Sequence, residues 1–330
     1  MSLSRRLFLV RLLQAAGLSA AAWLLGRRWL QLHWHEEVCI LRANSYEQDL
    51  ARQILQGMHA LGIGPREVAG KRILLKPNLV EPTTSSPHIN THPAVVYGAA
   101  AAFRSLGASH LIVAEGPGHN HDSLLVLEES GLAEVLISAK LPFVDLNHDQ
   151  VVLRKNAGGH APLKTLALPA TLGQVDWIVS LPKLKTHHWT GVTLSLKNLF
   201  GVMPGNYYGW PKNVLHWAGI SRCILDIAAT VRPHFAIVDG IVGMEGDGPI
   251  MGTPKQAGVL VMGRNLTAVD ATCSRIMGIN PYKVEYLAKA DGWLGPLSVR
   301  DIRQRGESPE AVQNNFLLLK KIPAHRNLRG

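Results

Sequence analysis

Short apolar runs alternate with longer amphipathic segments along most of the chain. The apolar runs predict strands at residues 36–45, 71–77, 110–115, 142–146, 176–181, 234–242 and 257–262. Apolar positions three and four residues apart predict helices at residues 46–61, 93–106, 123–130, 131–139, 213–231 and 266–277. Because strands that alternate with helices form parallel sheets, we expect an α/β fold with a mixed, mostly parallel sheet and helices on both faces.

Three segments give weaker signals. Residues 147–174 are polar and rich in Gly and Pro, which is typical of a β-hairpin excursion. Residues 190–201 fit either a helix that begins at Thr190 or a strand with Val192 and Leu194 on one side, and the two periodicities compete. The section from Tyr282 onward has little pattern, and we expect it to pack against the sheet. Residues 36–330 are therefore predicted to form a single domain.

The N-terminal segment, residues 1–35, has the features of an export signal. Residues 4–9, SRRLFL, are similar to the twin-arginine pattern, with Val10 where a lysine is common. The moderately apolar residues 12–25 that follow are short for a membrane span of about 20 residues but suit a signal sequence. We expect export by the twin-arginine translocase to the periplasm. A cleavage site at residues 20–22 would free the protein, whereas Arg27 and Arg28 would favour an uncleaved membrane anchor. The alternative is an ordinary amphipathic helix.

Charge and cysteine content exclude two classes of protein. The net charge is +10, but residues 1–35 hold five arginines and no acidic residue, so half of the excess lies there. We find no basic run with interleaved aromatic residues and expect no nucleic-acid binding. The three cysteines are far apart and form no C-x-x-C pair, which excludes a four-cysteine iron–sulfur cluster within one chain. Cys223 and Cys273 are predicted core residues, although one disulfide could form in an oxidising compartment.

Polar side chains follow four of the predicted strands. Lys76 and Asn78 come at the end of one strand, Glu115 ends the next, and residues 183–185 and Asp239 follow two others. In open α/β sheets, ligands bind outside the carboxyl ends of the strands. Each of these residues alone could be an exposed strand end, but together they predict a polar site.

The segment of residues 181–205, LPKLKTHHWTGVTLSLKNLFGVMPG, adds cations to that edge. If it is extended, Lys183, Lys185 and His187 share one face, where they would bind a carboxylate, phosphate or sulfated group. Crowded ammonium groups lower one another's pKa, which suits a base or nucleophile. The alternative is a solvated basic edge. His188 is expected to point away and to be structural.

Lys197 and Asn198 lie in an apolar surround, where a cation needs a partner. We expect that partner to be Asp239, Glu245 or Asp247. These three acids lie in residues 239–254, DGIVGMEGDGPIMGTP, which we interpret as a glycine-rich loop. They could bind a hard cation or act as a general acid/base pair, or they could be solvated acids of a structural loop.

A second segment is a candidate transition-metal site. His119 and His121 form a short His-x-His pair that could chelate a metal, with Glu115 or Asp122 as a carboxylate ligand. Such pairs also arise by chance in a chain with 15 histidines. The sequence has no G-x-S-x-G, G-x-x-x-x-G-K-[ST] or G-x-G-x-x-G motif, which disfavours serine hydrolases, phosphate-loop proteins and dinucleotide folds.

Seven further patterns are found at residues 75–78, 115–116, 181–187, 197–201, 239–240, 245–249 and 268–270. Taken together, these segments resemble the domain-of-unknown-function family 362 (DUF362). The resemblance covers roughly residues 36–280 and implies a shared fold and a shared polar site. Many relatives of this kind carry an appended ferredoxin-like cysteine segment, which this chain lacks. A more distant similarity is to nickel-pincer lactate racemases, which place lysine and histidine around a carboxylate substrate.

We therefore expect an exported enzyme with a polar pocket that acts on a small anionic substrate by redox or racemase-like chemistry, using a metal or another cofactor. The alternative is a non-catalytic protein that binds a metal or an anionic ligand. The predicted catalytic residues are Lys183, Lys185, His187, Lys197, Asp239 and Glu245, and the predicted ligand-binding residues are Lys76, Asn78, Glu115, Asn198 and Asp247.

Overall fold

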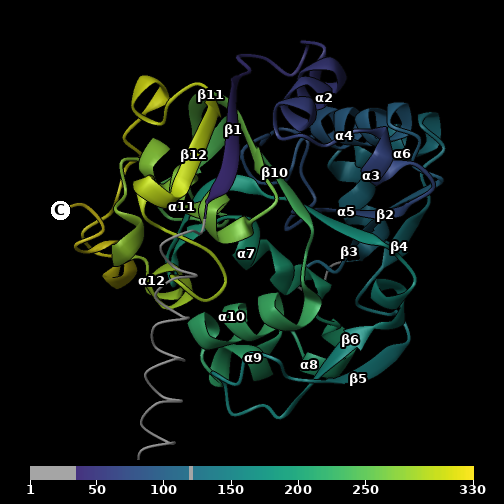
Figure 1. Ribbon diagram of the computed structural model, residues 1–330. Coiled ribbons are helices and arrows are strands. Elements are labelled where there is room, and N and C mark those ends of the chain that lie inside the picture. Colours follow the sequence, from purple (N-terminus) through teal and green to yellow (C-terminus); the bar gives the residue numbers. More distant parts are fainter. Residues whose placement is uncertain (1–34, 119–121) are drawn as a thin grey trace, which may run out of the picture. The chain divides into compact units, whose positions relative to one another are not determined.

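A large mixed sheet forms the centre of the fold (Figure 1). The computed structural model describes residues 35–118 and 122–330. Within these residues the strand order is β12-β1-β11-β10-β7-β2-β3-β4, and β8 and β9 extend the sheet beside β10. The strands are β1 (Glu36–Arg42), β2 (Arg72–Pro77), β3 (His110–Glu115), β4 (Phe143–Asp145), β7 (Trp177–Leu181), β8 (Lys183–His187), β9 (Gly191–Thr193), β10 (Phe235–Glu245), β11 (Thr253–Gly263) and β12 (Ile302–Gly306).

The run from β10 through β7, β2 and β3 to β4 is parallel, whereas β11 is antiparallel to both of its neighbours. The expected α/β fold with a mostly parallel sheet is therefore confirmed. A separate antiparallel pair, β5 (Val151–Lys155) and β6 (Thr165–Pro169), is the hairpin predicted in residues 147–174.

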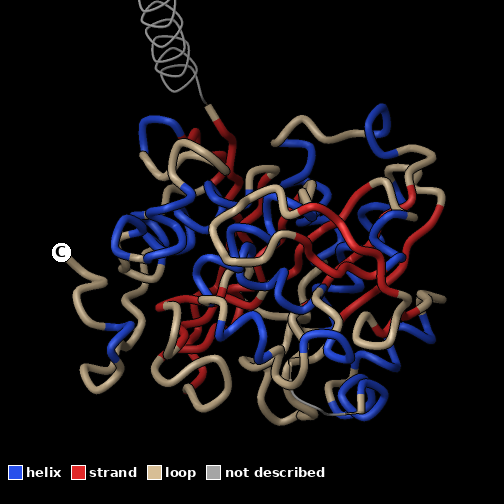
Figure 2. Tube along the Cα trace, turned by 90° about the horizontal axis from the view of Figure 1, so that it is seen from below, coloured by secondary structure: helices blue, strands red, loops and turns tan. Residues whose placement is uncertain are grey.

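Helices cover both faces of the sheet, and the strand β2 shows why. Ile73 and Leu75 pack into one apolar cluster and Leu74 into the other. A strand that is buried on both faces must be apolar at successive positions, which explains its continuous apolar run. In the tube view the strands run through the interior, among helical segments (Figure 2). The helices are α2 (Leu50–Ala60), α3 (Pro65–Val68), α4 (Pro93–Ser105), α5 (Ser123–Glu129), α6 (Leu132–Ser138), α7 (Ser195–Asn198), α8 (Gly205–Tyr208), α9 (Asn213–Trp217), α10 (Ile220–Val231), α11 (Leu266–Ile276) and α12 (Glu285–Ala290).

The glycine-rich acidic segment differs from the prediction. It was expected to be a loop from residue 239, but β10 continues to Glu245 and pairs with β11, with an irregularity between Gly240 and Val242. Gly240 allows this pairing because a Cβ there would lie 2.9 Å from the Val259 side chain and 3.1 Å from that of Leu184. The glycines thus allow two strands to pack closely, and the loop shortens to residues 246–252.

Two further segments resolve differently from their patterns. Residues 190–201 contain both alternatives, because β9 is followed at once by α7 and then by a 3₁₀ turn at Leu199–Val202. The predicted helix at residues 213–231 is two helices, α9 and α10, interrupted at Gly219, whose φ is 103°.

The C-terminal section adds an edge strand, β12, parallel to β1. In β12 Ile302 is buried and its neighbours are exposed or half-buried, which explains the weak apolar signal.

Cys39, Cys223 and Cys273 are all buried and unpaired. The prediction that Cys223 and Cys273 are core residues is confirmed, and none of the three cysteines forms a disulfide in the structure.

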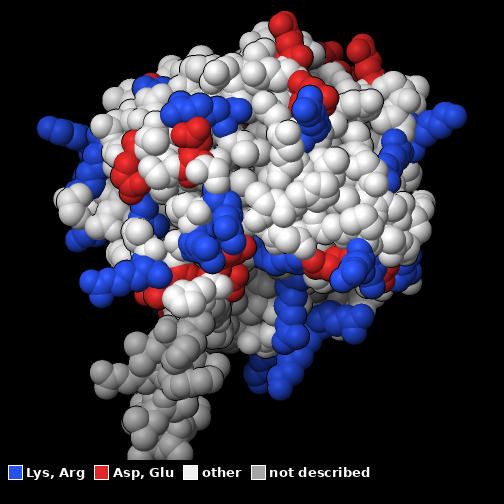
Figure 3. All heavy atoms as spheres, turned by 45° about the horizontal axis from the view of Figure 1, so that its top comes forward, with Lys and Arg blue, Asp and Glu red and all other residues white. Residues whose placement is uncertain are grey.

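None of the helices in the described residues is long and apolar enough to cross a bilayer. On the face shown in Figure 3, lysines and arginines lie mostly towards the rim, several of them beside acidic residues, and a broad area carries no charged side chain.

Candidate functional site

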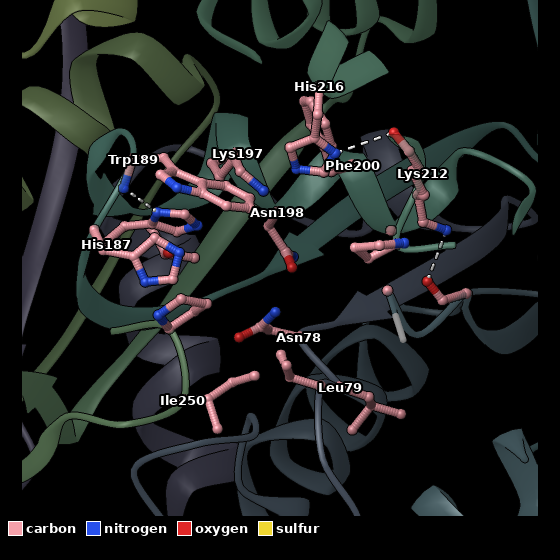
Figure 4. A pocket seen from close by; sticks show the side chains of 18 of the residues that line it. Asn78, Leu79, His187, Trp189, Lys197, Asn198, Phe200, Lys212, His216 and Ile250 are labelled. Carbon is pink, nitrogen blue, oxygen red and sulfur yellow. Dashed lines mark hydrogen bonds between the residues drawn. The ribbon is translucent and has the colours of Figure 1, made fainter. Parts of the chain in front are cut away.

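A cavity of about 380 Å³ lies at the carboxyl ends of the parallel strands. Asn78 follows β2, Glu115 ends β3, and His187 ends β8. The helices α7 and α9 contribute the side chains that face these strand ends, among them Lys197 and His216 (Figure 4). The other lining residues are Leu79, Val80, Gly116, Gly118, His188, Trp189, Thr193, Asn198, Phe200, Gly201, Pro211, Lys212, Asp247, Pro249, Ile250 and Met251.

A buried ion pair closes one wall of this cavity. Lys76 contacts Glu115 through a short hydrogen bond between Nζ and Oε2, and the two side chains are 0% and 2% exposed. Burial lowers the pKa of Lys76 and raises that of Glu115, while the charge of each partner opposes the shift of the other. Gly201 crosses directly over this pair, and a Cβ at that position would collide with the Glu115 carboxylate. The pair therefore requires both strand ends and a glycine above them.

Asn198, the last residue of α7, is hydrogen-bonded to Lys76 of this pair. Its Oδ1 accepts from Lys76 Nζ at 3.2 Å, and its Nδ2 donates to the Lys76 carbonyl at 3.1 Å and to Ser180 Oγ at 3.0 Å. All of the amide's partners are thus protein atoms, which fixes the orientation of the side chain. Asn198 is placed to position Lys76 and Glu115.

Lys212 lies at the opposite end of the cavity, where it links three segments of the chain. Its buried Nζ donates to the Asn147 Oδ1 at 2.9 Å, to the Gly116 carbonyl at 3.1 Å, and to the Met203 carbonyl. An ammonium group has three N–H donors, so a protonated Lys212 has no donor left for a ligand. Burial lowers the pKa of Lys212 to about 7. We interpret Lys212 as a structural tie between three segments.

Lys197 is different, because it has no hydrogen bond and no ion pair with any described residue. Its Nζ lies 4.2 Å from the centre of the Phe200 ring, a cation–π contact. Burial, and secondly the charge of Lys76, lower the pKa of Lys197 to about 8. The expected partners Asp239, Glu245 and Asp247 are each engaged elsewhere, so that prediction is wrong. Lys197 remains available to an anion in the cavity.

Asp270, in α11, positions Lys197 by capping its short helix. Its carboxylate accepts from the Ser195 N–H at 2.8 Å and the Leu196 N–H at 3.0 Å, and it also bonds the Ser195 hydroxyl. A helix of four residues cannot be stable by itself, because nucleation is costly. These bonds to α11 therefore hold α7, and with it Lys197, in place.

Replacing Asp270 by Ala should destabilise the protein by about 3 kcal/mol, because two backbone donors and one hydroxyl lose their buried partner. Urea unfolding of Asp270→Ala measures this loss. Asp291→Ala is a suitable control, because it removes a single hydrogen bond to a backbone N–H, that of Leu297. Equal losses in the two variants would contradict the positioning assigned to Asp270.

Two histidines present opposite groups to the cavity. The Trp189 N–H donates to His187 Nδ1 at 3.0 Å, so in the neutral ring Nε2 carries the proton and is a donor. His216 Nδ1 lies 3.1 Å from the Lys212 carbonyl, an acceptor, so Nδ1 carries the proton and Nε2 has a free lone pair. Burial lowers the pKa of both rings, which keeps them neutral at pH 7. The cavity thus holds a neutral donor and a neutral base.

Two oxygens of the lining also have no partner among the described residues. They are Asn78 Oδ1 and Thr193 Oγ1, and both atoms are buried. A buried polar atom without a hydrogen bond costs free energy, which a bound ligand or water would recover. Both belong to residues that, like Lys197, line the cavity. The cavity lining therefore contains a cation, Lys197, and two oxygen atoms that have no hydrogen-bond partner among the described residues.

Several predicted site residues lie outside this cavity. Lys183 and Asp239 form a second buried pair, with Nζ and Oδ2 2.7 Å apart and both side chains 0% exposed. The Tyr46 hydroxyl accepts from Lys183 at 2.8 Å and donates to Asp239 at 3.0 Å. Lys185 is buried, and its Nζ donates to the Pro249 carbonyl at 3.3 Å. Burial lowers the pKa of Lys185 well below its usual value. Of the predicted basic face of β8, His187 alone lines the cavity.

The three acids predicted to bind a cation together are dispersed. Asp239 pairs with Lys183, Glu245 lies 3.4 Å from Lys255, and Asp247 lies 3.5 Å from His188. Among residues 35–118 and 122–330, no three His, Cys, Asp or Glu side chains gather as potential metal ligands. The strand pairing of β10 with β11 separates the acids, so the shared cation site is not formed there.

Two histidine predictions have different outcomes. The proposed metal ligands His119 and His121 lie outside the described residues. His188, which was expected to point away, lines the cavity next to Asp247.

Sequence reasoning missed Lys212, His216, Thr193 and Asp270 as parts of the site. Lys212 and His216 are separated from the predicted strand ends by the turns around α8, so no strand-end argument could find them. Lys212 follows the Trp210–Pro211 turn with a φ of 69°, an unusual angle that only the structure reveals. Asp270 belongs to a segment that resembles the family, but no pattern in the sequence places it in the site.

Comparison with known proteins gives two partial likenesses. The chain is 28% identical, over 266 residues, to the thylakoid-associated protein sll1697 of Synechocystis. The aligned region covers 77% of this chain and 78% of that protein. Among solved structures, the lactate racemase apoprotein from Thermoanaerobacterium thermosaccharolyticum matches with a TM-score of 0.45 and 14% identity. That match covers 74% of this chain and 57% of the racemase chain.

A family model also matches. The model described as "Domain of unknown function (DUF362)" covers residues 73–275, which include the whole cavity lining and Asp270. The chain belongs to the DUF362 family.

Proposed function

We propose that this protein is an enzyme that binds a small organic carboxylate in the cavity and transfers a proton at the carbon next to the carboxylate. The observation that carries the proposal is Lys197. It lines the same cavity as two residues with unpartnered oxygens and two neutral histidines, and it has no anionic partner among the described residues. Lys197 is half-buried, and a cation partly withdrawn from water without a partner is costly, so an anionic ligand would stabilise the site.

The proposed step uses the two histidines in different ways. His216 Nε2 takes the proton from the carbon and becomes imidazolium, and the electron pair of the broken C–H bond moves into the carboxylate. The resulting enediolate would be stabilised by the Lys197 ammonium and by the His187 Nε2–H group. The proton then returns from His216 to carbon. Both imidazoles lie next to the Trp189 ring, whose centre is 6.1 Å from that of His187 and 5.0 Å from that of His216.

Solvent exchange tests this proposal. In D₂O, small 2-hydroxy and 2-amino carboxylates incubated with the protein should gain deuterium at the carbon next to the carboxylate, which proton NMR detects. His216→Gln should lose at least about 100-fold of this rate, the usual contribution of a general base, and should retain binding. Lys71→Met, at an exposed lysine, is the control. Binding without exchange would support the alternative, a non-catalytic anion-binding protein.

The affinity for a carboxylate should depend on pH through Lys197. Its pKa in the free protein is about 8, so the ammonium is present below that value and is lost above it. We expect constant affinity between pH 6 and 7 and a fall approaching about tenfold per pH unit above 8. In Lys197→Arg the guanidinium stays charged, so calorimetric titration should show this fall removed. An unchanged profile in that variant would contradict the assignment.

A metal or another cofactor remains part of the proposal. The predicted ligands His119 and His121 lie outside the described residues, and Gly118 at the start of that segment lines the cavity. Elemental analysis of protein purified after native export tests this point. A stoichiometric transition metal that is lost in His119→Ala with His121→Ala would support it, and metal-free protein with full exchange activity would contradict it.

We also propose that the twin-arginine translocase exports the chain to the periplasm, as a free or membrane-anchored protein. The support is the SRRLFL pattern of residues 4–9. The name of the cyanobacterial relative, a thylakoid-associated protein, agrees with a location at or beyond a membrane. Arg5→Lys with Arg6→Lys should leave the protein in the cytoplasm, which cell fractionation measures. Export of that variant at the original level would contradict the proposal.

A further inference from the structure

The cavity has a polar side and an apolar side that face each other. Figure 4 shows Lys197 and Asn198 across the cavity from Leu79 and Ile250. The polar side comes from α7 and the strand ends. The apolar side comes from residues 79–80, which follow β2, and from residues 249–251, in the loop between β10 and β11.

The apolar side continues to the surface. Leu79 is buried, Ile250 is half-buried and Met251 is 78% exposed. The exposed Trp189 lies at the end of the cavity where His187 is found (Figure 4). The apolar side chains of Leu79, Ile250 and Met251 therefore lead from the interior of the cavity to its opening.

The size of the cavity indicates how large the ligand is. Its volume of about 380 Å³ lies within the range of about 300 to 1,000 Å³ that is usual for ligand pockets. A carboxylate with two or three carbon atoms would occupy a small part of this space and would leave the apolar side in contact with water. A ligand that satisfies both sides needs a carboxylate and an apolar portion of several carbon atoms.

The number of free cations indicates the charge of the ligand. The Lys76 ammonium is paired with Glu115, and the three donors of Lys212 are used by oxygens of the protein. Lys197 is then the cation of the described lining that has no hydrogen-bonded or ion-paired partner. A single carboxylate matches one such cation, whereas a dianion would also meet the nearby Glu115 carboxylate.

We propose that the substrate is an amphiphilic monocarboxylate, with its carboxylate at Lys197 and an apolar chain along Leu79, Ile250 and Met251. This rests on the proposed function and specifies the substrate class of the same site. The apolar chain extends along these residues towards Met251, and the carbon next to the carboxylate lies near Lys197 and the two histidines.

A chain-length series tests this inference. Acetate, butanoate, hexanoate and octanoate are titrated into the full-length protein by isothermal titration calorimetry. Each added methylene that is buried should raise the affinity roughly fourfold, from the usual free energy of burying one methylene group. In Ile250→Asn this gain should be at least halved while acetate binding is retained. Ile137→Asn, at an apolar residue of α6 that is 78% exposed, is the matched control and should behave as the wild type.

The outcomes separate the two proposals. Binding that requires Lys197 but does not strengthen with chain length would overturn the amphiphilic substrate and leave the proposed function standing. A chain-length gain that is the same in Ile250→Asn, Met251→Ser and the wild type would also overturn it. If none of the four carboxylates binds in a Lys197-dependent way, both the proposed function and this inference fail.

Discussion

Glu115→Gln should lower the free energy of unfolding by about 3 to 5 kcal/mol, the usual effect of removing one partner of a buried ion pair. The reason is that Lys76 is fully buried and would keep an ammonium without a compensating charge. Lys76 could avoid this only by losing its proton, which also costs free energy at pH 7. Urea unfolding followed by circular dichroism measures the change.

The pH dependence gives this prediction a specific signature. Burial lowers the pKa of Lys76 in the folded state below that in the unfolded state, so the unfolded state binds the extra proton. The destabilisation is therefore fully present at pH 7 and shrinks as the pH rises towards the unfolded value. Glu129→Gln, at an exposed acid of α5, is the control and should change stability little. A loss in Glu115→Gln that is small, or that grows with pH, would be inconsistent with the buried pair.

Replacing both members of the pair should cost less than replacing Glu115 alone. In Lys76→Met with Glu115→Leu no charge is left buried, and such replacements are often neutral or stabilising. We expect this double variant to recover most of the lost stability and to retain the folded cavity.

Lys197→Met should weaken carboxylate binding by at least about 100-fold, the loss typical of truncating one partner of a charge pair away from water. Methionine keeps the length and the contact with Phe200, so the change removes the charge and little else. Because the ammonium pays a desolvation cost without a partner, we expect the free protein to be as stable as the wild type or more so. Calorimetric titration with hexanoate and urea unfolding give the two quantities.

Lys71→Met serves as the matched control for this variant, since Lys71 is exposed and does not line the cavity. Its affinity for hexanoate should equal that of the wild type. Equal affinity in Lys197→Met and Lys71→Met would show that the anion does not meet Lys197.

The fold class could be predicted from the sequence because the central strands are buried on both faces. β2 and β3 read as continuous apolar runs, and the predicted limits of the second, residues 110–115, match those of β3. The edge strand β12 was missed because an exposed edge needs few apolar residues. The extent of β10 was missed because its glycines, which suggest a loop, are required by the close approach of β11.

The site was predicted less completely than the fold, for a physical reason. The strand-end rule brought Asn78 and Glu115 into one region, and the apolar surround singled out Lys197 and Asn198; the cavity includes all four. It could not distinguish Lys197, which has no anionic partner in the described chain, from Lys183, whose charge is met by Asp239. Which lysine finds a carboxylate depends on contacts between residues that are far apart in the sequence, such as Lys183 and Tyr46.

The most direct test of a carboxylate at Lys197 is a crystal structure of the protein with hexanoate bound. We expect electron density in the cavity at the ends of β2, β3 and β8, with a carboxylate oxygen at the ~2.7–2.9 Å of a charge-assisted hydrogen bond from Lys197 Nζ. We also expect the alkyl chain to contact Leu79 and Ile250. Hexanoate bound elsewhere, or bound in the cavity with its carboxylate turned away from Lys197, would show that Lys197 does not bind the carboxylate.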